Sequence, residues 1–323
     1  MLKSLQPYGT FICFVGLVVF FALMLPGTFM TGRNLVNISQ QMSMLAVTAF
    51  AMTVVMAMGD FDLSVGSMAS LAGIAAALTF QTTDSVSLGL CLALLVGVAG
   101  GALNGFLVSY LGILPFVATL GTLTIFSGTA FLVSGGKTIF GSAIPASFSG
   151  IAKGGIPIWW SGDQVLLLPN LTIVAILTLF IIWFVLEKMV FGRHVYAMGG
   201  NAEAARLAGI DVRKTRLLAF CITGLGSSIA GLMYAARVAS ANPTQGSGLM
   251  LDAIAAVFLG MTMGRHGEPR VFYTLIGVLL IGVLSNGLTQ LSVDSYVRDI
   301  LVGTIIISAV ALGRVDKLQR NQA

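Results

Sequence analysis

Two carboxylates stand close together in the segment Gly59-Asp60-Phe61-Asp62-Leu63-Ser64, which joins two apolar runs. Paired carboxylates can hydrolyse glycosidic bonds, and acidic residues near a membrane can mark an ion pathway, so Asp60 and Asp62 are the first candidates for chemistry. No pocket-forming polar residues accompany the pair, which argues against a hydrolase. The remaining interpretations are a gate, a contact with a partner subunit, or helix capping by Asp62 or Ser64 after a turn at Gly59.

Three further polar residues interrupt or open apolar runs: Asn104, Asp252 and Asn286. A polar group in hydrocarbon is costly unless it is paired, so Asn104 and Asn286 either join neighbouring helices or line a translocation path, and Asp252 is a further candidate for a gate or for that path. The sequence around Asn104 (Gly101–Gly105) is similar to that around Asn286 (Gly282–Gly287), with one residue inserted. The two stretches lie five predicted spans apart, which predicts an inverted five-helix repeat, although chance similarity between apolar sequences is an equal alternative.

The elements that carry these residues are membrane-spanning helices. The 323 residues are 57% hydrophobic and only 9% charged, whereas a soluble domain has about 25% charged residues. A helix needs about 20 apolar residues to cross the hydrocarbon. Such runs predict an all-α, polytopic bundle of about ten helices that forms a single domain, residues 1–323. The expected spans are 9–25, 38–58, 63–80, 86–110, 113–133, 166–186, 217–236, 252–263, 271–291 and 297–313. The run at 252–263 is short enough to be a broken span.

The distribution of basic residues predicts how this bundle is oriented. An even number of spans puts both termini on one side, together with the polar segment 187–216. If that side is the cytoplasm, 12 of the 17 basic residues are inside, in agreement with the excess of Lys and Arg in cytoplasmic loops. The five that remain outside are Arg33, Lys137, Lys153, Arg237 and Arg298. The Gly- and Ser-rich stretch 134–165 then becomes an outer connector, with Trp159 and Trp160 at the lipid headgroups.

The sequence contains no signature of an enzyme or of a bound cofactor. Gly135-Gly136-Lys137-Thr138 resembles the end of a phosphate-binding loop, but Phe131 occupies the position where that motif needs its first glycine. The two histidines and three cysteines lack the spacing of metal ligands. Nucleic acid is not expected as a partner, because no basic stretch has interleaved aromatic residues. The chain is therefore expected to use no metal or cofactor and to hydrolyse no ATP itself.

The segment 187–216 is the one long polar and basic stretch. Within it, Asn201 is suited to cap a short helix whose first turn holds Glu203, a favourable place for a carboxylate. Gly209 can end that helix in a left-handed turn. The helix is too short to cross a membrane, so it is either an interfacial helix or a surface for a soluble partner. The candidate contact residues are Asn201, Glu203, Ala204, Ala205, Arg206 and Gly209.

Several motifs make the chain similar to the permease subunits of bacterial ABC importers of the ribose, xylose and arabinose type. The resemblance covers nearly everything from Asn34 onward. It rests on Asn34–Gln41, Gly59–Ser67, Phe191–Asn201, Glu203–Gly209 and Leu251–Val257. The chain departs from the family in Met261–Arg270, where Pro269 and charged residues replace a Gly-rich loop.

The resemblance implies a coupling helix at Glu203–Gly209 on which a cytoplasmic ATP-binding subunit docks. It also implies a second permease subunit, identical or related, in the inner membrane, and a periplasmic protein that delivers a monosaccharide. A polyol, a nucleoside or a furanose-like signal molecule is an alternative solute. An ion-coupled secondary transporter is an alternative mechanism, for which Asp60, Asp62 and Asp252 are the candidate ion sites. An intramembrane enzyme is disfavoured, because the spans lack a His or Ser–Lys constellation.

Overall fold

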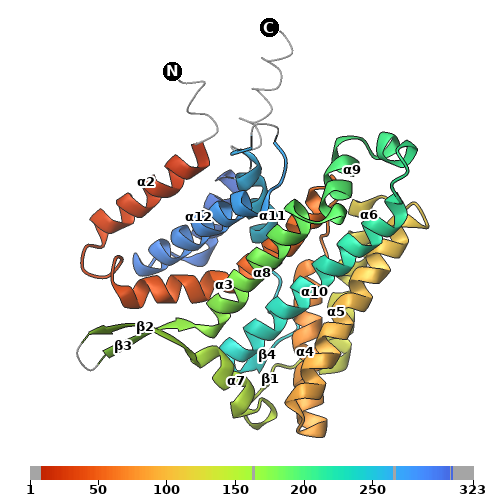
Figure 1. Ribbon diagram of the computed structural model, residues 1–323. Helices are drawn as coiled ribbons and strands as arrows, with labels where there is room; N and C mark the ends of the chain where they lie inside the picture. Colours follow the sequence, from red (N-terminus) through yellow and green to blue (C-terminus); the bar gives the residue numbers. More distant parts are fainter. Residues whose placement is uncertain (1–8, 162–163, 265–266, 306, 308–323) are drawn as a thin grey trace, which may run out of the picture.

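The computed structural model describes residues 9–161, 164–264, 267–305 and 307 (Figure 1). Its helices form one bundle, and the prediction of an all-α membrane protein is confirmed. The helices are α2 (Gly9–Met24), α3 (Gly32–Met56), α4 (Val65–Thr83), α5 (Val86–Ser109), α6 (Pro115–Ser134), α7 (Ala146–Lys153), α8 (Asn170–Glu187), α9 (Val190–Leu207), α10 (Val212–Val238), α11 (Leu249–Met261) and α12 (Val271–Gln290).

Seven of the described helices are long and apolar enough to cross a membrane: α3, α4, α5, α6, α8, α10 and α12. The shorter apolar helices α2 and α11 match the expected runs at 9–25 and 252–263. Residues 295–305 are also helical, and the rest of the expected span at 297–313 lies almost wholly outside the described residues. Each expected span therefore overlaps a described helix, although residues 166–169 of the span expected at 166–186 belong to strand β3 (Gln164–Pro169), and the total of ten is not established.

Helix α3 is the centre of the bundle. Every residue from Ser43 to Met56 is buried, and the helix packs against α8, α10, α11 and α12. It begins six residues before the predicted span at 38–58, because the Thr31 hydroxyl caps it by accepting a hydrogen bond from the Asn34 backbone N–H. Its first turns are polar, so hydropathy alone does not reveal them.

Helices α5 and α10 approach each other through glycine. A Cβ atom placed on Gly97, Gly101 or Gly105 would lie 2.3–2.7 Å from atoms of α10, which is closer than atoms can approach. Spacing of small residues by four allows two helix backbones to meet in lipid. The glycine stripe Gly97, Gly101 and Gly105 therefore allows α5 and α10 to pack closely.

Helix α11 is short because the chain before it turns back into the bundle. Strand β4 (Ser240–Ala241) pairs with β1 (Ile139–Phe140). The Gly246 backbone N–H then donates a hydrogen bond to the Ser70 hydroxyl, 2.8 Å away, and Gly246 packs directly on Gly66 of α4. Helix α11 therefore begins beside the first turn of α4, where Met250 also contacts Gly66.

The stretch 134–165 is more regular than the expected connector. It contains β1, a single 3-10 turn (Gly141–Ala143), α7 and the strand β2 (Gly155–Ser161), which pairs with β3 (Gln164–Pro169) in an antiparallel hairpin. The hairpin and α7 lie at the end of the bundle away from α9 (Figure 1). The side chains of Trp159 and Trp160, expected at the headgroups, lie outside the described part of the structure.

The start of α2, helix α9 and the start of α10 share one end of the bundle, toward the top and right of Figure 1. The start of α3, the hairpin and α7 lie at the opposite end. The start of the expected span at 9–25 and the segment 187–216 therefore lie at the same end of the bundle, whereas the termini themselves lie outside the described residues. We call these the α9 end and the hairpin end.

The structure gives no support to the predicted inverted repeat around Asn104 and Asn286. Gly101 and Gly105 contact the backbone of α10, whereas Gly282 contacts Met42 and Gly287 contacts Phe21. The two asparagines also bind different kinds of partner, as described below. Similar short sequences therefore do not perform equivalent packing roles.

Candidate functional site

The segment between α3 and α4 is buried and holds the two carboxylates apart. Gly59 has a φ of +83°, which confirms the turn predicted there. Asp60 then turns toward the first turns of α10, where its carboxylate lies 2.6 Å from Nε of Arg216. Asp60 is only 6% exposed. The ion pair therefore fixes the entry to α4 against the start of α10, directly after the segment 187–216.

Asp62 faces a different set of partners. Its carboxylate accepts hydrogen bonds from the Ser64 N–H at 2.9 Å and the Ser64 hydroxyl at 2.6 Å. Asn104 donates to the same carboxylate and to Ser64, and its own carbonyl accepts a hydrogen bond from Thr122. Asn104 thus joins α4, α5 and α6, so the structure favours the helix-joining role.

The prediction that Asp62 or Ser64 caps α4 is wrong in detail. Ser64 occupies the N-cap position, but its side chain makes no capping hydrogen bond. Its hydroxyl instead donates to Asp62, which is 1% exposed. A buried carboxylate requires several hydrogen-bond donors, so the Ser64 hydroxyl donates to Asp62 and does not cap the helix.

Asp252 and Asn286 are also paired. The Asp252 carboxylate, in the first turn of α11, lies 2.5 Å from Nη2 of Arg298. Asn286 and Asn34 exchange two side-chain hydrogen bonds, each 3.1 Å long, which join α12 to α3. Each candidate ion-site carboxylate therefore has an arginine or a set of hydrogen-bond donors, and this counts against the ion-coupled alternative.

The predicted short helix in the segment 187–216 is present. Asn201 leaves the helical conformation, with φ of −160° and ψ of 104°, and divides α9 into two parts. Its side-chain oxygen accepts hydrogen bonds from the N–H groups of Glu203 and Ala204, both at 3.0 Å. Gly209 follows with a φ of +86°. The predicted cap and the predicted left-handed stop are both confirmed. We call residues 201–209 the stub.

The two parts of α9 differ in how they contact the bundle. In the first part Gly192, Val195 and Met198 are buried, and Gly199 packs on the backbone of Ala57. In the stub only Ala205 is buried, and Leu207 is 78% exposed. The stub therefore projects from an anchored base.

The charged residues of the stub pair with each other. Arg206 donates two hydrogen bonds to Glu203, and these hold the pKa of Glu203 below its usual value. Glu203 is therefore ionised at neutral pH. The structure thus brings Asn201, Glu203, Ala204, Ala205, Arg206 and Gly209 together on one short element, in which Ala205 is buried and the other five residues are exposed.

The atypical segment Met261–Arg270 contacts the base of α9. The Tyr196 hydroxyl donates to the carbonyl oxygen of Pro269 at 3.1 Å. Arg270 lies 3.4 Å from Glu187 and also stacks over the Tyr196 ring. His266 lies outside the described residues. Among the described residues, no three His, Cys, Asp or Glu side chains are grouped so that they could hold a metal ion.

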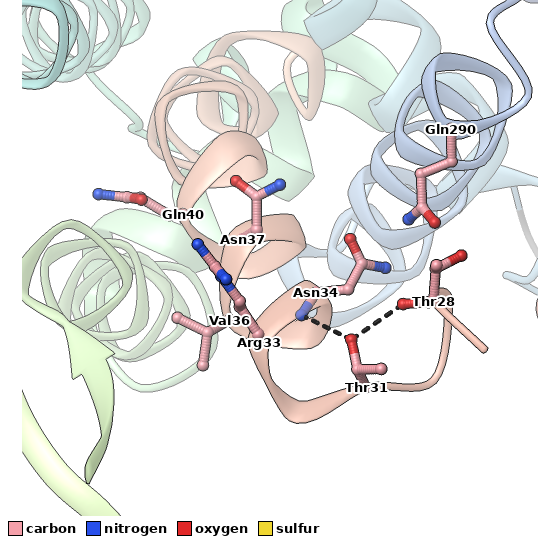
Figure 2. Close-up of a pocket in the computed structure, with 8 residues that line it drawn as sticks. All are labelled: Thr28, Thr31, Arg33, Asn34, Val36, Asn37, Gln40 and Gln290. Carbon is pink, nitrogen blue, oxygen red and sulfur yellow. Dashed lines mark hydrogen bonds between the residues drawn. The ribbon is translucent and has the colours of Figure 1, made fainter. Parts of the chain in front are cut away.

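A polar pocket at the hairpin end was not predicted. It has a volume of about 540 Å³ and is formed by the turn before α3, the first turns of α3 and the last residue of α12 (Figure 2). Its lining residues are Thr28, Thr31, Arg33, Asn34, Val36, Asn37, Gln40 and Gln290. The sequence did contain a signal for this pocket. Arg33, Asn37 and Gln40 are spaced at i, i+4 and i+7, so they form one polar face of a helix just before an apolar run.

Comparison with known proteins places the chain in a family. Residues 34–310 match the family described as branched-chain amino acid transport system / permease component. The chain is 36% identical to the ribose import permease protein RbsC of Bacillus subtilis (strain 168), over 96% of this chain and 93% of that protein. No solved structure matches the chain.

Two Escherichia coli (strain K12) proteins show similar relationships. The D-allose transport system permease protein AlsC is 35% identical over 95% of this chain and 91% of its own length. The L-arabinose transport system permease protein AraH is 33% identical over 95% and 90%. These matches cover nearly the whole length of this chain. The chain therefore belongs to the family of transport-system permease components that includes the sugar permeases RbsC, AlsC and AraH.

Proposed function

We propose that this chain is the membrane permease subunit of an ATP-driven importer for a small sugar. The observation that carries the proposal is the stub, a capped and exposed helix that projects from an anchored base. A cytoplasmic ATP-binding subunit binds the exposed residues Asn201, Glu203, Ala204, Arg206 and Gly209, while the buried Ala205 holds the stub against the bundle. The relatives with ribose, allose and arabinose in their names support a monosaccharide as the solute.

The orientation of the proposed importer follows from charge. The α9 end carries the larger group of basic residues among those described, namely Lys188, Arg193, Arg206, Arg213, Lys214, Arg216 and Arg270. Since cytoplasmic loops carry an excess of such residues, this end faces the cytoplasm. The hairpin end then faces the periplasm, where a binding protein delivers the sugar. A second permease subunit, identical or related, completes the transporter in the inner membrane.

The Asp60–Arg216 ion pair gives the stub a route to the membrane helices. Gly209 is followed closely by α10, whose N-cap Asp211 accepts a hydrogen bond from Lys214. Arg216 lies in the next turn and holds Asp60. A displacement of the stub by the ATPase therefore reaches both α10 and the entry to α4. For such coupling the ATPase must bind the outward-facing and inward-facing states with different affinity.

The substitution Glu203→Lys tests the coupling role. It reverses an exposed charge and breaks the pair with Arg206 without touching the bundle. We expect normal insertion in the membrane, loss of the ATPase on co-purification, and at least a tenfold fall in uptake of radiolabelled ribose, allose or arabinose. Lys137→Glu, an equal charge reversal at an exposed site on the hairpin end, should retain ATPase binding. Normal uptake by Glu203→Lys would refute the coupling role.

A second measurement separates the importer from an ion-coupled transporter. Uptake is measured in cells whose proton gradient has been dissipated while ATP is kept high. The proposed importer continues to accumulate sugar under these conditions. A collapse of uptake would instead support ion coupling and would reopen the roles of Asp60, Asp62 and Asp252.

A further inference from the structure

The turn that precedes α11 lies at the middle depth of the membrane helices. Gly246 in this turn packs on Gly66 of α4. Two residues further along α4, Met68 reaches Gly100 of α5 and packs on Phe126 of α6. Gly100 lies 14 residues after the start of α5 and nine before its end, and Phe126 lies 11 residues after the start of α6 and eight before its end. Because each helical residue adds about 1.5 Å, the turn is inside the bundle and well away from both of its ends.

Five residues beside this turn present polar side chains or bare backbone on the outside of the described chain. Ser247 and Gly248 are both exposed. Asp252, in the first turn of α11, lies 2.5 Å from Nη2 of Arg298, and the two side chains are 19% and 30% exposed. Asp299 lies 3.9 Å from Nε of Arg298, and its side chain is 74% exposed. We call Ser247, Gly248, Asp252, Arg298 and Asp299 the polar strip.

Lipid cannot cover the polar strip. Met250 packs on Gly66, so the first turn of α11 stays at the depth of the turn before it. Backbone outside a helix occurs at membrane depth only where protein buries it or where it lines a water-filled cavity. A charged side chain at the centre of the hydrocarbon costs about 3 kcal/mol or more. The exposed backbone at Gly248 and the exposed carboxylate of Asp299 therefore require water or protein.

Water suits the polar strip better than a closely packed protein surface. Arg298 lies between the carboxylates of Asp252 and Asp299, so the strip carries one net negative charge. Covering these three ions with a dry protein surface would cost several kcal/mol per ion unless that surface supplied a further cation. Leu251 and Ile300, the chain neighbours of the two acidic residues, are exposed and apolar, so the polar area available to offset this cost is narrow.

We infer that the polar strip lines the water-filled path along which the solute crosses the permease, with Asp252, Arg298 and Asp299 as its charged wall. The inference rests on the proposed function. Helix α11 leads from the strip to the segment Met261–Arg270, where the carbonyl oxygen of Pro269 accepts the hydrogen bond from Tyr196 at the base of α9. One helix therefore joins the wall of the path to the base of the stub, so a displacement of that base moves the wall.

The accessibility of one added thiol tests the path. Ser247→Cys is introduced into the complete transporter, with its ATPase and binding protein, in membrane vesicles that contain ATP. A membrane-impermeant, positively charged methanethiosulfonate is added outside the vesicles or loaded inside them. Mass spectrometry measures the rate of modification at residue 247, and uptake of ribose, allose and arabinose is measured before and after treatment.

Two controls accompany this variant. Leu95→Cys places a thiol at an apolar position that is 65% exposed and lies near the middle of α5, nine residues after its start. Treated wild type gives the background from the native cysteines, Cys13, Cys91 and Cys221.

We expect the reagent to modify Ser247→Cys about tenfold faster than Leu95→Cys, because the reactive thiolate forms in water and not in lipid. Modification attaches a charged group to the wall of the path, so uptake by Ser247→Cys should be lost while treated wild type retains it. If Ser247→Cys does not insert in the membrane, Asp299→Cys provides the same comparison at the most exposed side chain of the ion cluster.

Three results would overturn the inference. Equal modification rates for Ser247→Cys and Leu95→Cys would place the polar strip in lipid. Protection from the reagent, together with a disulfide between two copies of Ser247→Cys, would show that a second chain covers the strip. Rapid modification with undiminished uptake would show that the water beside the strip is not on the path. Failure of the proposed function has a different signature, because wild type would then import none of the three sugars, while the ratio of modification rates would still show whether the strip faces water.

Discussion

Helices α10 and α12 both pack in the interior of the bundle, yet they are held by different interactions. Helix α10 meets α5 through glycines with no room for a Cβ atom, and it meets the α3–α4 segment through the Asp60–Arg216 ion pair. Helix α12 meets the start of α3 through amides, one of which retains an unused acceptor. The α10 contacts leave no room for a shift of the helix, whereas the α12 contacts are hydrogen bonds between side chains, which contribute little each in a membrane. The two sides therefore differ in how strongly they should resist substitution.

The largest expected effect comes from breaking the ion pair on the α10 side. Arg216→Met leaves the buried carboxylate of Asp60 without its partner, and we expect a loss of about 3–5 kcal/mol in unfolding free energy. Denaturant unfolding of the purified protein in detergent measures it. The double variant Asp60→Asn/Arg216→Met should recover most of the loss. If the double variant is no more stable than the single one, the pair does not hold this side together.

A smaller effect is expected from the glycine contact. In Gly101→Ala the added Cβ would lie 2.3 Å from the carbonyl oxygen of Phe220, so the two helices must separate. Such overpacking costs about 1–3 kcal/mol. Gly121 of α6 has no described atom within 4 Å of its Cβ position, so Gly121→Ala is the control and should change stability by less than about 0.5 kcal/mol. Equal effects at both sites would contradict the rigid contact.

The smallest effect is expected on the α12 side. Asn286→Ala removes the hydrogen bonds to Asn34 and Gln290, and interhelical hydrogen bonds in membranes contribute only about 0.6 kcal/mol on average. A double-mutant cycle with Asn34→Ala measures the coupling directly. A coupling energy above about 2 kcal/mol would remove the contrast between the two sides.

The sequence was sufficient to predict features that depend on local chemistry. Runs of apolar residues located the membrane helices, and the order Asn201, Glu203, Gly209 located the stub with its cap and its stop. These features depend on residues close together in the chain. The glycine stripe on α5 was also recognisable, because its spacing by four is sufficient to indicate close helix packing.

Features that depend on distant residues were predicted less well. The pocket was missed because Gln290 joins α3 only after the chain has folded, and the polar start of α3 falls below any hydropathy threshold. The capping role of Ser64 was wrong because Asn104, 40 residues away, completes a network around Asp62. The similarity between Gly101–Gly105 and Gly282–Gly287 did not predict their different neighbours. Sequence alone cannot show which distant side chain a buried polar group will meet.

The break at Asn201 has a consequence for how such transporters diverge. Only Ala205 of the stub is buried, so substitutions elsewhere in residues 201–209 leave the membrane helices untouched. On the proposed function, specificity for the ATP-binding subunit and specificity for the sugar can therefore change independently. A graft that exchanges this nine-residue module with that of a relative should redirect the permease to a foreign ATPase while its choice of sugar stays the same.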